Sequence, residues 1–218
     1  MGYNIAIDGP AGAGKSTIAK LVAKKKGYIY VDTGAMYRGL AIHFLKKGIA
    51  ADDVAAIEAA CDTADVTIGY ENNAQQVYLN GENITGMLRK EEVGAMASRT
   101  SGIPKVRATL MELQQTMART KDVVMDGRDI GTVILPNADV KVYLTASVEC
   151  RAKRRYLELL EKGVACNLED ISKEIEERDY RDMHRETSPL KQAEDAVLVD
   201  SSDMTIEEVV DTIIALCK

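Results

Sequence analysis

Short apolar runs alternate along this chain with longer segments in which apolar residues recur at helical spacing. The apolar runs predict buried strands at residues 3–8, 28–31, 123–126, 140–144 and 196–200. After the first strand, Ile18, Leu21 and Val22 predict one buried face of a helix over 17–26, which Gly27 ends. Alternating strands and helices predict an α/β fold, with a parallel five-stranded sheet flanked by helices.

Residues 62–85 interrupt this alternation. Short strands are expected at 66–70, 75–79 and 82–85, with turns at Asn72-Asn73 and Asn80-Gly81. We interpret this segment as a small β-rich insertion in the α/β core. Such an insertion could clamp a second substrate, or it could be an interaction module.

Helical periodicity returns after the insertion. Two helices are expected, and Pro104 suits the first position of the second one. Its apolar stripe, which we expect in the core, is Val106, Leu110, Leu113 and Met117. Arg107 lies on the flank of this stripe, where it could reach a ligand. The last helix opens with a capping box made by Thr205 and Glu208.

The loop between the first strand and the first helix reads Gly-Pro-Ala-Gly-Ala-Gly-Lys-Ser. It fits the pattern Gly-x4-Gly-Lys-Ser/Thr of phosphate-binding loops, in which backbone N–H groups and a helix N-terminus surround phosphate. Lys15 would face solvent or ligand and contact the β- and γ-phosphates, and the Ser16 hydroxyl would ligate Mg²⁺. The alternative is a fortuitous glycine-rich turn.

Charged residues follow the ends of other predicted strands, where parallel sheets bind ligands. Asp126 ends one strand, and an acid there commonly holds the water shell of a metal beside a phosphate-binding loop. Arg128 and Asp129 follow it directly. Arg38 follows the second strand, with Asp32 or Thr33 as the helix cap. Arg38 could meet a second phosphate-bearing ligand, or it could be a solvated surface arginine.

Arginines are concentrated in one region. Six of the twelve lie between residues 151 and 185, on one helix expected over 147–163 and another beginning near Asn167. Two salt-bridged surface helices would be one explanation. Because the rigid guanidinium fork suits phosphate oxygens, we favour a mobile helical hairpin that closes over a triphosphate as a lid.

Composition narrows the class of protein. The chain has 218 residues, 46% hydrophobic, and a net charge of −6, which argues against general binding to nucleic acid or membrane surfaces. The first strand begins almost at once, so we expect no signal peptide. The four scattered cysteines predict free thiols in a reducing cytoplasm, and the two histidines suggest no metal site. Nothing in the pattern demands a dimer, so we expect a monomer.

A phosphate-binding loop, a clamp and an arginine-rich lid together predict transfer of a γ-phosphoryl group to a small acceptor. Four motifs then resemble the bacterial cytidylate kinases over essentially the whole chain. They are Gly9–Thr17, Asp32–Arg38, Asp126–Thr132, and Arg178–Arg185 with Ser188–Leu190. The resemblance implies a P-loop NTPase-like kinase that transfers phosphoryl from ATP to CMP or dCMP with Mg²⁺.

The resemblance also implies an organisation and a set of roles. The core would be 1–61, 86–150 and 190–218, the nucleoside monophosphate (NMP)-binding insertion 62–85, and the lid 151–189. ATP would contact Gly9, Pro10, Ala11, Gly12, Ala13, Gly14, Lys15, Ser16 and Thr17. The phosphate of the acceptor would contact Arg38, Arg128 and Arg185. The edge of its cytosine would contact Thr33, Arg107 and Asp129. Its sugar would lie near Ser98, Arg178 and Asp182. The catalytic residues would be Lys15, Arg128, Arg154, Arg155 and Arg185, and Mg²⁺ would be held by Ser16 and, through water, Asp126.

The chemistry of the base supports cytosine separately. A carboxylate such as Asp129 accepts from the N4 amino group of cytosine but faces an acceptor, O4, in uracil. An arginine such as Arg107 matches the O2 and N3 acceptors. The alternatives are a kinase for UMP, AMP or a non-nucleotide such as shikimate or gluconate, and a nucleotide-dependent switch without catalytic function.

Overall fold

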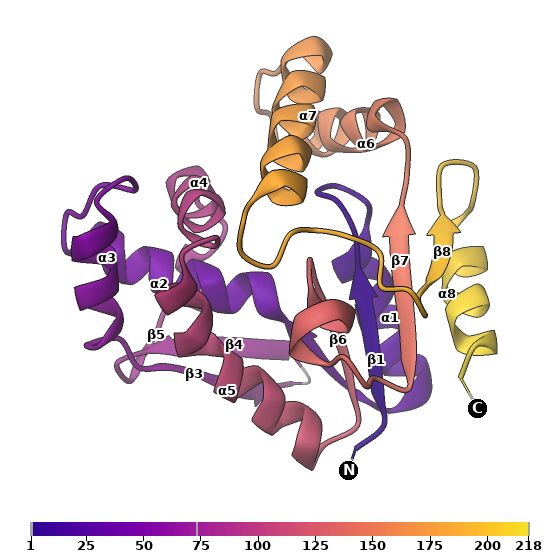
Figure 1. Cartoon of the computed structure of the whole chain (residues 1–218). Helices are drawn as coiled ribbons and strands as arrows, with labels where there is room; N and C mark the ends of the chain where they lie inside the picture. The colour runs from indigo at the N-terminus through magenta and orange to yellow at the C-terminus, as the bar shows by residue number, and fades with distance from the viewer. Residues whose placement is uncertain (1, 73, 218) are drawn as a thin grey trace. The chain divides into compact units, whose positions relative to one another are not determined.

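The structure, a computed structural model, describes residues 2–72 and 74–217, and Figure 1 follows the chain through its elements. The chain forms two compact units, each of which is described by itself. The first comprises Met1–Tyr30 and Lys121–Lys218, and the second comprises Val31–Thr120. The predicted division into core, NMP-binding insertion and lid concerns function and stays a prediction.

A five-stranded sheet in the order β2-β6-β1-β7-β8 is built largely from the first unit. Its strands are β1 (Asn4–Asp8), β2 (Ile29–Asp32), β6 (Val123–Gly127), β7 (Val140–Thr145) and β8 (Val197–Asp200). The pairings of β1 with β6 and β7, and of β7 with β8, are parallel. The predicted α/β fold and all five predicted strands are therefore confirmed.

One side of this sheet packs against α1 (Lys15–Lys26) and α8 (Ile206–Ala215) through a shared apolar core. Ile18 and Val22 are buried there as predicted, but Leu21 is 36% exposed. The buried face of α1 also includes Ala19 and Ala23, so its centre is rotated away from Leu21. The capping box at the start of α8 is present.

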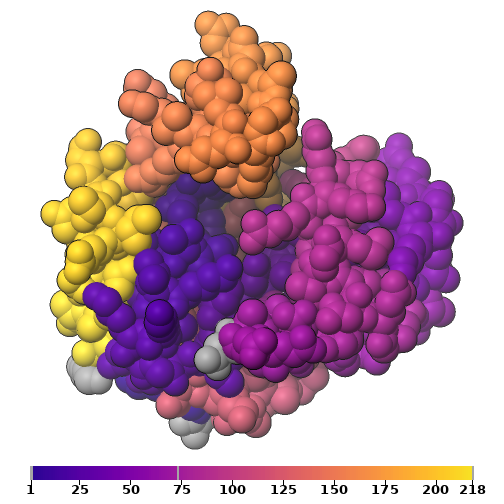
Figure 2. Space-filling view, turned by 180° about the vertical axis from the view of Figure 1, so that it is seen from behind, coloured from indigo at the N-terminus to yellow at the C-terminus, as the bar shows by residue number. Residues whose placement is uncertain are grey.

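The two arginine-bearing helices pair as predicted. They are α6 (Val148–Glu161), capped by Ser147, and α7 (Leu168–His184), capped by Asn167. Ala152, Ile171 and Ile175 form a small core between them. In the space-filling view, α6 is salmon and α7 is orange (Figure 2). Between β6 and β7 the chain makes one π-helical turn, η2 (Ile130–Ile134).

The second unit combines helices with the predicted meander. Its elements are α2 (Thr33–Lys46), α3 (Val54–Cys61), β3 (Val66–Glu71), β4 (Ala74–Leu79), β5 (Glu82–Asn83), η1 (Thr85–Met87), α4 (Glu91–Thr100) and α5 (Pro104–Thr120). The three strands form an antiparallel sheet, and the turn at Asn80 and Gly81 has positive φ at both residues. Thr85 begins η1 instead of ending a strand. The other predicted turn includes Asn73, which lies outside the described residues.

The buried face of α5 differs from the predicted stripe. Val106 and Leu110 are buried, but Leu113 and Met117 are only half-buried. Gln114 and Ala118 take the buried positions instead. The buried row advances by four residues at each step, and apolar periodicity alone does not distinguish this row from the neighbouring one.

Two findings concern the described part of the chain as a whole. Its four cysteines are free thiols, as predicted. Among the described residues, no helix combines the length and the apolar character needed to cross a membrane.

Candidate active site

The phosphate-binding loop runs from Gly9 to Gly14, between β1 and α1. Gly9 is required by close packing, because a Cβ atom there would lie 1.9 Å from the carbonyl oxygen of Leu144. Gly14 is the N-cap of α1 and has a φ of 83°, a conformation that glycine adopts at little cost. A glycine cap has no side chain to occupy the N–H groups of the first turn. The local geometry is therefore that of an anion-binding helix N-terminus.

Lys15 was predicted to face solvent or ligand; its side chain is buried, which excludes solvent, and the ligand-facing role stays a prediction. Its Nζ donates to the carbonyl oxygen of Pro10 at 2.6 Å. Burial, and then the nearby charge of Arg128, lower the pKa of the Lys15 ammonium group. The carbonyl contact has a physical reason, because a buried cation needs an acceptor. The contact also holds the ammonium group inside the loop.

The two predicted Mg²⁺-binding residues lie together. Ser16 Oγ donates to Asp126 Oδ2 at 3.0 Å, and Asp126 is buried at the end of β6. Tyr30 on β2 donates its hydroxyl to the other carboxylate oxygen at 2.9 Å. A hydroxyl beside a carboxylate supplies the oxygen ligands that Mg²⁺ prefers. Tyr30 was not predicted to belong to the site, because its only signal in the sequence was its place in the second strand.

Asp8 is a second buried carboxylate that the sequence analysis missed. It ends β1, directly before the loop, and accepts the N–H groups of Ile130 at 2.8 Å and Gly131 at 2.7 Å. Burial raises the pKa of Asp8 to about 6 although both N–H groups oppose the shift, and the charge of Asp129 adds to it. Asp8 thus ties the phosphate-binding loop to the η2 turn. The one signal of this role in the sequence was the position of an acidic residue at the end of a predicted strand.

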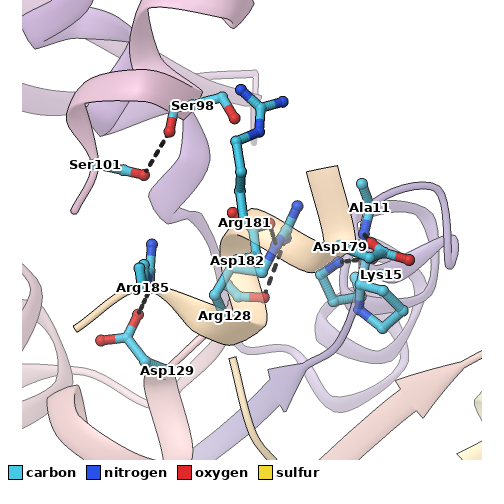
Figure 3. Close-up of polar contacts among 12 residues, drawn as sticks. Ala11, Lys15, Ser98, Ser101, Arg128, Asp129, Asp179, Arg181, Asp182 and Arg185 are labelled. Atoms are coloured by element: carbon cyan, nitrogen blue, oxygen red, sulfur yellow. Dashed lines mark hydrogen bonds and ion pairs between the residues drawn. The ribbon is translucent and has the colours of Figure 1, made fainter. Parts of the chain in front are cut away.

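A cluster of charges joins the end of α7 to the segment after β6 (Figure 3). Arg128 Nε donates to Asp182 Oδ2 at 2.8 Å, and Arg185 Nη2 lies 3.7 Å from Asp129 Oδ1. Burial tends to raise the pKa of Asp182, but the charges of Arg128, Arg178 and Arg185 outweigh it and lower the pKa. The first unit thus gathers five residues that were predicted to bind the acceptor.

Arg151 is the most buried arginine of α6 and α7, and its role was not predicted. Its Nη1 donates to the carbonyl oxygen of Ala11 at 2.9 Å and lies 2.6 Å from Asp179 Oδ2. The other oxygen of Asp179 accepts the N–H of Ala11 at 3.4 Å. α6 and α7 therefore both bind main-chain groups of Ala11 in the phosphate-binding loop. The density of arginines in the sequence did not reveal which of them would turn toward that loop.

Arg154 and Arg155 were predicted to contact the transferring phosphoryl group. Arg154 Nη2 donates to the carbonyl oxygen of Ser201 at 2.7 Å, and exposed Arg155 pairs with Glu158 at 3.0 Å. Their catalytic role stays a prediction.

In the second unit, α2 presents Thr33 and Arg38 within its first two turns. Asp32 Oδ1 caps the helix by accepting the N–H of Ala35 at 2.9 Å, and Thr33 is buried. A Cβ atom added to Gly34 would lie 3.2 Å from Asp32 Oδ1 and 3.6 Å from Arg38 Nη1. The Arg38 side chain therefore lies over this first turn.

Arg107 lies beside the buried row of α5, and its own side chain is buried within the second unit. Its Nη1 donates to the carbonyl oxygen of Ser101 at 3.2 Å, and its guanidinium carbon lies 5.7 Å from the centre of the Tyr37 ring. The Ser101 hydroxyl donates to the carbonyl oxygen of Ser98 at 3.2 Å. Tyr37 and Ser101, which were not predicted, thus hold predicted residues in place.

The predicted site residues divide between the units. The first unit contains Lys15, Ser16, Asp126, Arg128, Asp129, Arg154, Arg155, Arg178, Asp182 and Arg185. The second contains Thr33, Arg38, Ser98 and Arg107. Within the described residues, no group of three or more histidine, cysteine, aspartate or glutamate side chains is placed to hold a metal ion.

Comparison with known proteins places this geometry in a family. A sequence profile described as cytidylate kinase matches residues 5–218. The cytidylate kinase of Caldicellulosiruptor saccharolyticus is 50% identical over 213 residues, which are 98% of this chain and 94% of that protein. The cytidylate kinase of Shouchella clausii is 48% identical over 100% of this chain and 96% of that protein.

A comparison of structures agrees on the fold alone. The shikimate kinase of Bacteroides thetaiotaomicron matches with a TM-score of 0.50 and 12% identity over 98% of this chain and 97% of that one. The sequence match spans nearly every element described above, including the phosphate-binding loop, the three-stranded insertion and the arginine-bearing helices. The chain therefore belongs to the cytidylate kinase family, a family of ATP-dependent nucleoside monophosphate kinases.

Proposed function

We propose that this protein transfers the γ-phosphoryl group of ATP to CMP or dCMP, giving ADP and CDP or dCDP. The observation that supports this most strongly is the family match over residues 5–218. The arginine and aspartate residues that the reaction needs are present, in the expected motifs. Free cysteines are consistent with a reducing cytoplasm, and we propose that the protein acts there as a monomer.

Phosphoryl transfer requires positioning and charge neutralisation more than covalent chemistry. Lys15, held in the loop by the Pro10 carbonyl, would exchange that acceptor for the β- and γ-phosphates of ATP. Ser16 and Asp126 fit Mg²⁺ and would hold it, the metal ion neutralising phosphate charge. Arg128 and Arg185, with Arg38 of the second unit, would bind the acceptor monophosphate. Arg154 and Arg155 would contact the transferring group.

Asp129 and Arg107 would read the cytosine ring, and Thr33 would add a hydroxyl. Asp129 is buried, and its Oδ1 lies 3.7 Å from Arg185 Nη2. Its carboxylate oxygens would accept from the N4 amino group. Uracil would place its O4 acceptor against that carboxylate, leaving both unpaired. Ser98, Arg178 and Asp182 would lie near the sugar.

A coupled assay of ADP formation tests the proposal, with ATP, Mg²⁺ and a panel of CMP, dCMP, UMP, AMP and shikimate. We expect kcat/KM to be highest for CMP and dCMP, and at least about tenfold lower for the others. Preferred turnover of UMP, AMP or shikimate would contradict the proposed acceptor. Hydrolysis of ATP without need for any acceptor would indicate a nucleotide-dependent switch instead.

A further inference from the structure

Gln75, on the second strand of the inserted sheet, binds both main-chain polar groups of Asp32. Gln75 Oε1 accepts the N–H of Asp32 at 2.9 Å, and Gln75 Nε2 donates to the Asp32 carbonyl oxygen at 3.1 Å. The two residues are 43 positions apart in the chain, and both belong to the second unit. A side-chain amide that binds a residue in this way replaces a neighbouring strand. It fixes the peptide groups on both sides of Asp32.

The second of these peptide groups leads directly into Thr33. Its carbonyl carbon belongs to Asp32 and its nitrogen to Thr33, so its orientation sets the position of the Thr33 side chain. The carboxylate of Asp32 caps α2 at Ala35, which adds a third restraint on the same residue. Gly34 lies close to both Asp32 and Arg38. Gln75 therefore acts on the start of α2, where Thr33 begins the first turn and the Arg38 side chain lies over it.

The packing of the inserted sheet against α2 does not depend on Gln75. A Cβ atom added to Gly39 of α2 would lie 3.3 Å from Val77, 3.4 Å from Val66 and 3.6 Å from Ile84. All three side chains are buried, so the sheet packs on the middle of α2 through close apolar contact. The half-buried Gln75 amide adds a polar restraint at one end of α2 only, where Thr33 begins the helix.

We propose that Gln75 is a positioning residue that holds Thr33 in place for recognition of the pyrimidine edge, and so links the inserted sheet to acceptor specificity. This inference rests on the proposed role of Thr33 in acceptor binding. It assigns Gln75 no contact with the nucleotide. Loss of the Gln75 amide should therefore weaken acceptor binding without affecting ATP.

The test compares Gln75→Met with Gln75→Glu and with Gln76→Met as the matched control. Methionine has a similar length but makes neither hydrogen bond, whereas glutamate retains only the acceptor for the Asp32 N–H. Gln76 is the next residue of β4, and its amide oxygen accepts from Asn83 Nδ2 at 3.2 Å, not from α2. We expect Gln75→Met to raise the KM and the calorimetric Kd for CMP about tenfold, and Gln75→Glu to raise them less. The KM for ATP should stay within about twofold, and Gln76→Met should behave as wild type.

A double-mutant cycle with Thr33→Val separates positioning from general stabilisation. If Gln75 acts through Thr33, Gln75→Met should weaken CMP binding little further in the Thr33→Val background. A full tenfold effect in that background would overturn the proposal. An equal rise in the KM for ATP and CMP, with a lower melting temperature, would also overturn it. If the wild type prefers another acceptor, the proposed function fails, and the same cycle run with that acceptor still decides the role of Gln75.

Discussion

The buried carboxylate of Asp8 gives the protein a specific dependence of stability on pH. Burial raises its pKa in the folded chain from an ordinary 3.8 to about 6. The folded state therefore binds a proton at the Asp8 carboxyl group more tightly than the unfolded state does. The contribution of protonated Asp8 to the free energy of unfolding is fully present below about pH 3.8 and is lost as the pH rises through about 6.

The size of the effect follows from the two pKa values. Because a tenfold change in proton affinity corresponds to about 1.36 kcal/mol, ionisation of Asp8 costs about 3 kcal/mol in total. Proton linkage places about 1.4 kcal/mol of this cost between pH 5 and pH 7.5. Asp8→Asn does not titrate, and its amide can accept only one of the two N–H groups that bind the carboxylate. This loss should destabilise the variant by an amount that does not change with pH.

Urea denaturation at about pH 5, 6 and 7.5 measures the difference in the free energy of unfolding between wild type and Asp8→Asn. We expect the advantage of wild type to shrink by about 1.4 kcal/mol from pH 5 to pH 7.5. Asp200→Asn is the control, because a hydrogen bond from the Ser202 hydroxyl lowers the pKa of exposed Asp200. The difference in the free energy of unfolding between wild type and Asp200→Asn should therefore stay constant from about pH 5 to pH 7.5. A constant difference for Asp8→Asn, or one that grows with pH, would refute the reasoning.

Three further substitutions test the site. Lys15→Met should abolish phosphoryl transfer and leave the circular dichroism spectrum unchanged, because methionine fills the same buried space; an unfolded variant would make Lys15 structural. Asp129→Asn should lower kcat/KM for CMP by at least about 100-fold, since the amide can present a donor to N4; an unchanged preference for CMP over UMP would show that another group reads the base. Asp182→Ala should lower the free energy of unfolding by about 3 kcal/mol, because it leaves the largely buried Arg128 without its partner; a loss below about 0.5 kcal/mol in urea denaturation would contradict this.

Local patterns predicted the order of strands and helices, the phosphate-binding loop and the caps of α2 and α8. Those features depend on residues a few positions apart, whose spacing the sequence displays directly. The rotation of a helix about its axis was harder to predict. Leu21 and Leu113 were expected in the core, but the neighbouring rows of side chains are buried more deeply. Which row faces inward is decided by the packing partners and not by periodicity alone.

Contacts between distant residues explain what the sequence analysis missed. Asp8 binds N–H groups 122 and 123 positions further along the chain. Arg151 was one of six similar arginines, and only the folded loop presents it with the Ala11 carbonyl and Asp179. Lys15 was expected to face solvent or ligand, yet the Pro10 carbonyl lies within its reach. Each case requires the three-dimensional path of the chain.

We propose that two nucleotides bind end to end, with ATP at the phosphate-binding loop and the phosphate of the acceptor bound by arginines. A crystal structure with CMP and a non-hydrolysable ATP analogue tests it directly, through the distances from the guanidinium groups to the CMP phosphate. We predict that Arg38, Arg128 and Arg185 all lie within hydrogen-bonding distance of that phosphate, with Lys15 on the analogue. CMP bound elsewhere, or a phosphate that none of these arginines contacts, would contradict the account.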